Sequence, residues 1–210
     1  MHVDILNDQQ KNILPILARA LAGTSLYLAG GTALALQVGH RPSIDFDWFG
    51  MQLGDPEILF RRLRSTGIGF RVLSITFETV YIEVDEVQVS FIGYRYPLLA
   101  PLVRWDGYGM SINLAGLDDI ACMKLSAVTN RGSRKDFIDL HYLITNYKSL
   151  QNYLALFEKK FKQRDIGHVL RSLVYFEEAE LEPEIKTLQT MNWQELKRDF
   201  ETWVKAIARQ

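Results

Sequence analysis

The chain has little of what marks secreted, disulfide-bonded or membrane proteins. It contains one cysteine, Cys122, among 210 residues, which excludes an intrachain disulfide and argues against a cysteine-based zinc site. No apolar run approaches the ~20 residues that a membrane-spanning helix needs. The first residues, MHVDILNDQQKNILP, lack the basic-then-apolar order of a signal peptide. We therefore expect a cytoplasmic protein without membrane segments.

An excess of positive charge is also missing. The formal net charge is -1, so no overall basic field attracts nucleic acid, and any contact with RNA has to be local. Two basic clusters are typical of solvated helix faces, and only a minority of such runs touch RNA: Arg61, Arg62 and Arg64, and then Lys159, Lys160, Lys162 and Arg164. A Gly-x-Ser-x-Gly nucleophile motif is absent, so the sequence gives no support for a serine hydrolase.

The patterning predicts an α+β fold: a mixed β-sheet core with helices, followed by a helical C-terminal part. In the first half we expect helices at Asp8–Leu21, Thr32–Val38 and Pro56–Ser65, and strands at Leu26–Ala29, Ile44–Phe49, Gly69–Thr76, Thr79–Val84, Val87–Gly93 and Gly109–Leu114. The second half predicts only helices, at Leu117–Asn130, Arg134–Tyr147, Ser149–Phe161, Ile166–Ala179 and Trp193–Ala208. Residues 1–115 and 116–210 are therefore expected to form two parts, or one continuous domain if the helices pack on the sheet.

The strand Ile44-Asp45-Phe46-Asp47-Trp48 alternates acidic and apolar side chains. Every second residue of a strand shares a face, so Asp45 and Asp47 project together, about 6–7 Å apart. Ile44, Phe46 and Trp48 are expected to bury the opposite face. Adjacent anions repel unless a cation compensates them, and Mg²⁺ or Mn²⁺ suits carboxylate oxygens. The alternative is a solvated strand face with two ordinary acids, the commoner meaning of a bare Asp-x-Asp.

A glycine turn precedes this acidic strand. Gly30-Gly31-Thr32 lies where one strand ends and a helix begins, so its backbone can approach a phosphate and offer free N–H groups. Thr32 either caps the helix or donates its hydroxyl to phosphate, and alone the triplet is an ordinary tight turn. With the acidic strand beside it, the turn predicts a metal–triphosphate site where a hydroxyl displaces pyrophosphate.

The helix from Leu117 carries a lysine in its apolar stripe. Lys124 falls between Ile120 and Val128, with Arg131 further along the same line, whereas Asp118 and Asp119 are assigned to the opposite, wet face. A cation on an apolar face needs an anion or must reach out to solvent. Either Lys124 forms a structural ion pair, for example with Asp136, or it contacts a triphosphate while Arg131 contacts a phosphate or an RNA backbone.

The following helix also carries charged residues, in this case acids, beside its apolar stripe. Asp136 lies beside its core stripe and Asp139 nearer the edge. Asp136 either faces a site or completes a capping box with Ser133, and Asp139 is able to pair with Lys135 on the surface. Among the remaining candidates, Arg41 either steadies phosphate or pairs with Asp45, and His141 is expected at the surface.

These motifs resemble the AbiEii/AbiGii toxin family of nucleotidyltransferases. The likeness rests on two segments, 26–49 and 117–143. The first contains Gly30-Gly31-Thr32-Ala33-Leu34-Ala35-Leu36 and His40-Arg41-x-Ser43-x-Asp45-x-Asp47-x-Phe49. The second contains Lys124-Leu125-x-Ala127 and Arg131-Gly132-x-x-Lys135-Asp136-Phe137-x-Asp139-Leu140.

The resemblance implies a metal-dependent enzyme that transfers a nucleotidyl group from a nucleoside triphosphate to a hydroxyl group. The acceptor hydroxyl belongs either to an RNA, such as transfer RNA, or to a protein. The resemblance also implies a toxin of a type IV-like toxin–antitoxin or abortive-infection system with an antitoxin partner. The implied catalytic residues are Asp45, Asp47, Lys124 and Asp136, with Asp45 and Asp47 as metal ligands. The implied nucleotide-binding residues are Gly30, Gly31, Thr32, Arg41, Ser43, Lys124 and Arg131.

One feature departs from nucleotidyltransferases, which usually carry a third carboxylate on a neighbouring strand. Here the corresponding face presents Gln88 and Ser90. Either Asp136 or Glu83 supplies the missing ligand, or the protein is a catalytically weak or inactive nucleotide-binding member of the same fold.

Overall fold

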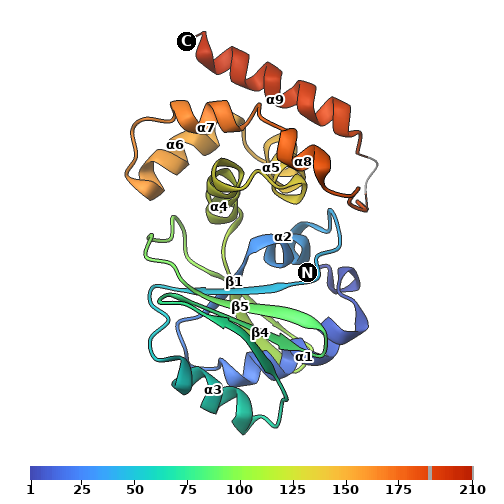
Figure 1. Cartoon of the computed structure of the whole chain (residues 1–210), viewed down its shortest axis with the longest axis vertical. Helices are drawn as coiled ribbons and strands as arrows, with labels where there is room; N and C mark the ends of the chain where they lie inside the picture. Colours follow the sequence, from blue (N-terminus) through green and yellow to red (C-terminus); the bar gives the residue numbers. More distant parts are fainter. Residues whose placement is uncertain (189–190, 210) are drawn as a thin grey trace. The chain divides into compact units, whose positions relative to one another are not determined.

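A computed structural model describes residues 1–188 and 191–209 of the chain. The chain divides into two compact units, Met1–Gly116 and Leu117–Gln210, called unit 1 and unit 2 below. Unit 1 combines a β-sheet with helices, whereas the regular elements described in unit 2 are all helical (Figure 1). This architecture confirms the predicted α+β fold.

Unit 1 is built on a mixed sheet of seven described strands in the order β3-β4-β5-β2-β1-β7-β6. The central strands β1 and β2 are antiparallel, while β2 pairs in parallel with β5, and β1 in parallel with β7. The remaining neighbours are antiparallel. The strands are β1 (Tyr27–Ala29), β2 (Phe46–Gly50), β3 (Arg71–Ile75), β4 (Thr79–Val84), β5 (Val87–Gly93), β6 (Val103–Gly107) and β7 (Met110–Leu114).

Helices lie on both faces of this sheet, with α1 and α3 on one side and α2 on the other (Figure 1). A short 3-10 helix, η1 (Val3–Ile5), precedes α1 (Asp8–Ala20), whose N-terminus is closed by a capping box between Asn7 and Gln10. The helix α3 (Pro56–Ser65) begins at a proline after the Asp55 N-cap, the arrangement that favours a helix start. The almost fully buried α2 (Gly30–Val38) follows β1 without an intervening loop.

Unit 2 is arranged around α4 (Leu117–Asn130), which contacts α5 (Arg134–Asn146), α6 (Leu150–Phe161) and α7 (Gly167–Ser172). The helix α5 also contacts α8 (Glu177–Leu181) and α9 (Trp193–Ala208). Phe137 of α5 lies 5.0 Å from Phe176 and 5.5 Å from Phe200, measured between ring centroids. This aromatic cluster fastens α8 and α9 to α5 through apolar burial.

Most element predictions are confirmed, and three are wrong. The strand β6 was not predicted, because its residues are largely exposed and lack a regular alternation. The helix expected over 166–179 is split into α7 and α8, because the chain turns so that Phe176 reaches the cluster around Phe137. The strand expected from Ile44 begins at Phe46, so Ile44 lies outside the ladder and is 64% exposed instead of buried.

Candidate nucleotide site

The acidic residues of unit 1 lie at the start of β2. Phe46 and Trp48 are buried, at 0% and 1% exposure, as the alternation predicts. Asp47 is half-buried on the opposite face, and Asp45, also half-buried, directly precedes the strand. The sheet pairs Asp47 with Ala29, the residue immediately before the glycine turn. The fold therefore brings the acidic strand and the turn together within unit 1.

Gly30 touches the acid directly. It has a φ of +68°, which L side chains rarely adopt, and a Cβ added there would lie 2.6 Å from Oδ2 of Asp47. A glycine is therefore required for two reasons, backbone conformation and space. The chain needs this residue to place the N-terminus of α2 beside a carboxylate.

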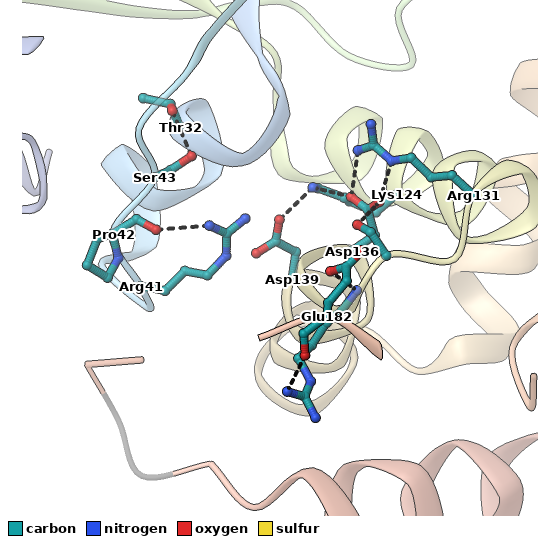
Figure 2. A network of polar contacts seen from close by, with 11 residues as sticks. Thr32, Arg41, Pro42, Ser43, Lys124, Arg131, Asp136, Asp139 and Glu182 are labelled. Atoms are coloured by element: carbon teal, nitrogen blue, oxygen red, sulfur yellow. Dashed lines mark hydrogen bonds and ion pairs between the residues drawn. The ribbon is translucent and has the colours of Figure 1, made fainter. Parts of the chain in front are cut away.

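Gly31 faces the loop that leads into β2. A Cβ at Gly31 would lie 2.8 Å from Nη2 of Arg41 and 3.0 Å from Oγ of Ser43. Arg41 is only 4% exposed, and its Nη1 donates a hydrogen bond to the Pro42 carbonyl at 2.9 Å. The predicted residues Gly31, Arg41 and Ser43 thus meet in unit 1, as Figure 2 shows for Arg41 and Ser43.

Thr32 fixes this loop. Its hydroxyl donates to the backbone carbonyl of Asp45. The same oxygen lies 2.9 Å from Oγ of Ser43, whose hydroxyl is able to donate to it (Figure 2). The helix N-cap is Ala29, so the expectation that Thr32 caps the helix is wrong. Gln10 supports the same loop from α1, its Nε2 donating to the Ser43 carbonyl at 2.8 Å. These bonds hold the approach to Asp45 and Asp47 in one conformation.

The donors of unit 1 suit a hard divalent cation. Among residues 1–188 and 191–209, no group of three or more histidine, cysteine, aspartate or glutamate side chains gathers as a metal site. Two neighbouring carboxylates, Asp45 and Asp47, are instead the donor set that Mg²⁺ uses when substrate phosphates and water complete its coordination. Asp45 and Asp47 would hold such an ion.

Neither β5, which pairs with β2, nor β4, the next strand of the sheet, brings a third carboxylate to Asp47. On β5, Ser90 stands directly opposite Asp47 and its Oγ donates a hydrogen bond to Oδ1 at 2.5 Å. On β4, Glu83 pairs across the sheet with Gln88. Its carboxylate forms an ion pair with Arg71 at 2.9 Å, so Glu83 is engaged at the sheet edge.

In unit 2, the predicted residues form an ion cluster in which Lys124 and the acids are buried and Arg131 is exposed. Lys124 is 5% exposed, and its Nζ lies 2.7 Å from Oδ1 of Asp136 and 2.6 Å from Oδ2 of Asp139 (Figure 2). Arg131 adds a contact from Nε to Oδ2 of Asp136 at 2.8 Å. The expected pairing of Lys124 with Asp136 is confirmed, and Asp139, which is fully buried, does not form the surface pair expected with Lys135.

Ser133 completes this cluster. It is the N-cap residue of α5, but its hydroxyl makes no capping bond and donates instead to Oδ2 of Asp136 at 2.8 Å. The expected capping box is therefore absent. Burial raises the pKa of Asp136, but the charges of Lys124 and Arg131 and their hydrogen bonds prevail and lower the pKa to about 2.

Two further expectations for unit 2 are wrong. Asp119, expected on a wet face, is fully buried and pairs with Lys160 at 2.6 Å, so Lys160 is no member of a solvated basic run. His141, expected at the surface, is 15% exposed at its side chain and lies 2.8 Å from Oδ2 of Asp199. Both partners lie more than 40 residues away in the chain, 41 and 58 respectively, and no local pattern indicates such pairs.

Structural comparison first defines the class of fold. The chain superposes on the crystal structure of JHP933 from Helicobacter pylori with a TM-score of 0.61 at 19% identity, over 97% of this chain and 94% of that one. It superposes on MenT4, a nucleotidyltransferase toxin of Mycobacterium tuberculosis H37Rv, with a TM-score of 0.60 at 15% identity, over 93% and 82%. The fold is that of the nucleotidyltransferases.

Sequence comparison identifies the family. The family model described as "Nucleotidyl transferase AbiEii toxin, Type IV TA system" matches residues 13–66 and 68–206. An uncharacterised protein of Aquifex aeolicus (strain VF5) is 35% identical over 205 residues, which cover 95% of this chain and 96% of that one. The chain belongs to the AbiEii nucleotidyltransferase toxin family. None of its described helices is long and apolar enough to cross a membrane.

Proposed function

We propose that this protein transfers a nucleotidyl group from a nucleoside triphosphate to a hydroxyl group of an RNA, such as transfer RNA, or of a protein. In this proposal it is the toxin of a type IV-like system with a cognate antitoxin. The observation that carries the proposal is the convergence of the glycine turn on the acidic strand. The N-terminus of α2 lies so near Asp47 that a Cβ added at Gly30 would lie 2.6 Å from its Oδ2. A helix N-terminus in this place offers phosphate-binding N–H groups beside a cation ligand.

The reaction itself is a displacement at phosphorus. The acceptor hydroxyl gives its proton to solvent water as its oxygen forms a bond to the α-phosphorus, the bond between the α-phosphorus and the bridging oxygen breaks, and pyrophosphate leaves with that oxygen. A divalent cation, when bound, neutralises phosphate charge and polarises the phosphorus. The backbone of Gly30 and Gly31 seats the phosphates, Arg41 and Ser43 border that seat, and Asp45 and Asp47 hold the cation.

Lys124, Arg131 and Asp136 are assigned to the same reaction on the family's motifs. Lys124 neutralises charge that develops on the triphosphate, and Arg131 contacts a phosphate. A carboxylate with a pKa of about 2 is a poor proton acceptor at neutral pH. Asp136 therefore serves as the residue that orients Lys124, with which it shares a 2.7 Å contact, and not as the general base. The assignment of residues 1–115 as the nucleotidyltransferase-like core and 116–210 as its helical complement belongs to this proposal.

Radioactive labelling tests the proposal. The protein is incubated with Mg²⁺, a cell extract containing RNA and protein, and each of the four ribonucleoside triphosphates labelled at the α-phosphate. Nucleotidyl transfer places the α-label in an acceptor, and digestion with nuclease or with protease identifies this acceptor as RNA or as protein. The same triphosphate labelled at the γ-phosphate is expected to leave no label on the acceptor. Asp47→Asn is expected to abolish transfer. The control is Asp85→Asn, which changes an acid at a left-handed turn position, φ 49°, that asparagine tolerates.

Each result has a definite meaning. Transfer that requires Asp47 but not Asp85 supports the proposal. Undiminished transfer by Asp47→Asn removes the acid from the mechanism. Saturable triphosphate binding without any transfer identifies a nucleotide-binding member of the family that has lost catalysis.

A further inference from the structure

Ser90 stands beside the acid that the proposed function needs most. The strand β5 runs parallel to β2, and the register sets Ser90 directly across from Asp47. Residues paired in this way project from the same face of a sheet. Ser90 is 2% exposed, and its hydroxyl donates to Oδ1 of Asp47 at 2.5 Å. The Ser90 side of this part-buried hydrogen bond is thus shielded from water, which otherwise competes for the hydroxyl.

The two carboxylate oxygens of Asp47 have different neighbours, Ser90 and Gly30. Oδ1 accepts the hydrogen bond from Ser90, whereas Oδ2 lies so near Gly30 that a Cβ there would approach it to 2.6 Å. An aspartate on a strand otherwise turns freely about its terminal torsion, which has a broad profile. Here the hydrogen bond from Ser90 holds one oxygen of the carboxylate, while the other oxygen faces Gly30, and this arrangement favours one orientation.

We infer that Ser90 is a positioning residue that holds the Asp47 carboxylate ready for a divalent cation bound with triphosphate. This inference rests on the proposed function, since it concerns the same site. A hydroxyl suits the task because it donates a hydrogen bond to one carboxylate oxygen and adds no negative charge beside Asp45 and Asp47. Partners that orient a metal ligand in this way typically change metal affinity about 10–100-fold when they are removed.

The test measures binding of the full-length protein to tripolyphosphate by calorimetry, with and without Mn²⁺. Tripolyphosphate imitates the triphosphate without committing to a base. Ser90→Ala is expected to weaken binding of the manganese complex about 10–100-fold and to leave binding of metal-free tripolyphosphate unchanged. Ser90→Thr keeps the hydroxyl and is expected to bind the manganese complex like the wild type. Ser65→Ala is the matched control, because the Ser65 hydroxyl donates to the Arg62 carbonyl on α3.

The outcomes separate this inference from the proposed function. If Asp47→Asn removes the gain in affinity that Mn²⁺ provides but Ser90→Ala retains it, the role of Ser90 is refuted and the proposed site stands. Equal losses in Ser90→Ala and Ser90→Thr also refute it, because they indicate packing and not the hydroxyl. If Mn²⁺ provides no gain, or a gain that Asp47→Asn leaves intact, the proposed cation site fails and the inference fails with it.

Discussion

Gly30 permits a quantitative test of the candidate site. Gly30→Ala introduces a Cβ at a φ of +68° and 2.6 Å from Oδ2 of Asp47. The left-handed conformation costs an L residue about 1–2 kcal/mol. In a chain of this size each kcal/mol lowers the thermal midpoint by roughly 2–4 °C, so we expect a decrease of about 2–8 °C. The Cβ also forces the Asp47 carboxylate to move.

A matched glycine separates strain from contact. Gly23 has a φ of +73°, and a Cβ there meets nothing within 4 Å. Gly23→Ala is therefore expected to lower the thermal midpoint by a similar amount through backbone strain alone. Because a displacement of about 1 Å at a reacting group costs roughly 100-fold in rate, we expect that loss of nucleotidyl transfer in Gly30→Ala but not in Gly23→Ala.

The assay combines differential scanning calorimetry with transfer of α-labelled triphosphate. Full transfer activity in Gly30→Ala would refute the argument, because it would show that the orientation of Asp47 is irrelevant to the reaction. An equal loss of transfer in both alanine variants would refute it too, since backbone strain without contact to Asp47 would then suffice.

Two predictions concern the stability of unit 2. Lys160→Met leaves the buried carboxylate of Asp119 without the ammonium group that lies 2.6 Å away. We expect the free energy of unfolding, measured with urea, to decrease by about 3–5 kcal/mol. Most of this loss should be recovered in the double variant with Asp119→Leu. The pKa of Asp136 is lowered from 3.8 to about 2 in the fold, which at 1.36 kcal/mol for each pKa unit corresponds to about 2–3 kcal/mol. That stability is fully present above pH 3.8 and is lost as the pH falls through 2, so the stability difference between wild type and Asp136→Asn should shrink over that range in urea titrations.

Local signals in the sequence predict most of the elements. The helix α3 follows from Asp55, Pro56 and an amphipathic run, and its bounds are confirmed. The chain turns between β4 and β5 at Asp85 and Glu86, which adopt φ values of 49° and 64°, a pair of left-handed residues typical of a two-residue hairpin turn. Such signals depend on neighbours within a few residues, so they survive in a single sequence.

Contacts between distant segments cannot be predicted from the patterns of this sequence. A helix wheel assigns α4 one buried stripe, but α4 contacts α5, α6 and α7, so a wider arc is covered and Asp119 is enclosed with Lys160. In the sequence, Ser90 is distinguished only as an uncharged residue on the strand where nucleotidyltransferases usually carry a third carboxylate. Its bond to Asp47 depends on the parallel pairing of β2 with β5, and strand order is not encoded in periodicity.

The buried lysines of unit 2 differ in a way that bears on function. Lys160 and Asp119 form a pair in which both side chains are 0% exposed, so a ligand has no access to either charge. Lys124 contacts two acids, and one of them, Asp136, is shared with Arg131, whose side chain is 58% exposed.

A buried ion pair is weak evidence for stability, because apolar residues of similar volume often serve as well. The shared acid makes Lys124 and Arg131 dependent on one another, so a phosphate that draws the exposed guanidinium away from Asp136 also changes the charge balance around Lys124. A cluster that serves stability alone needs no such exposed member, which is why we assign the charges around Lys124, and not those around Lys160, to the proposed reaction.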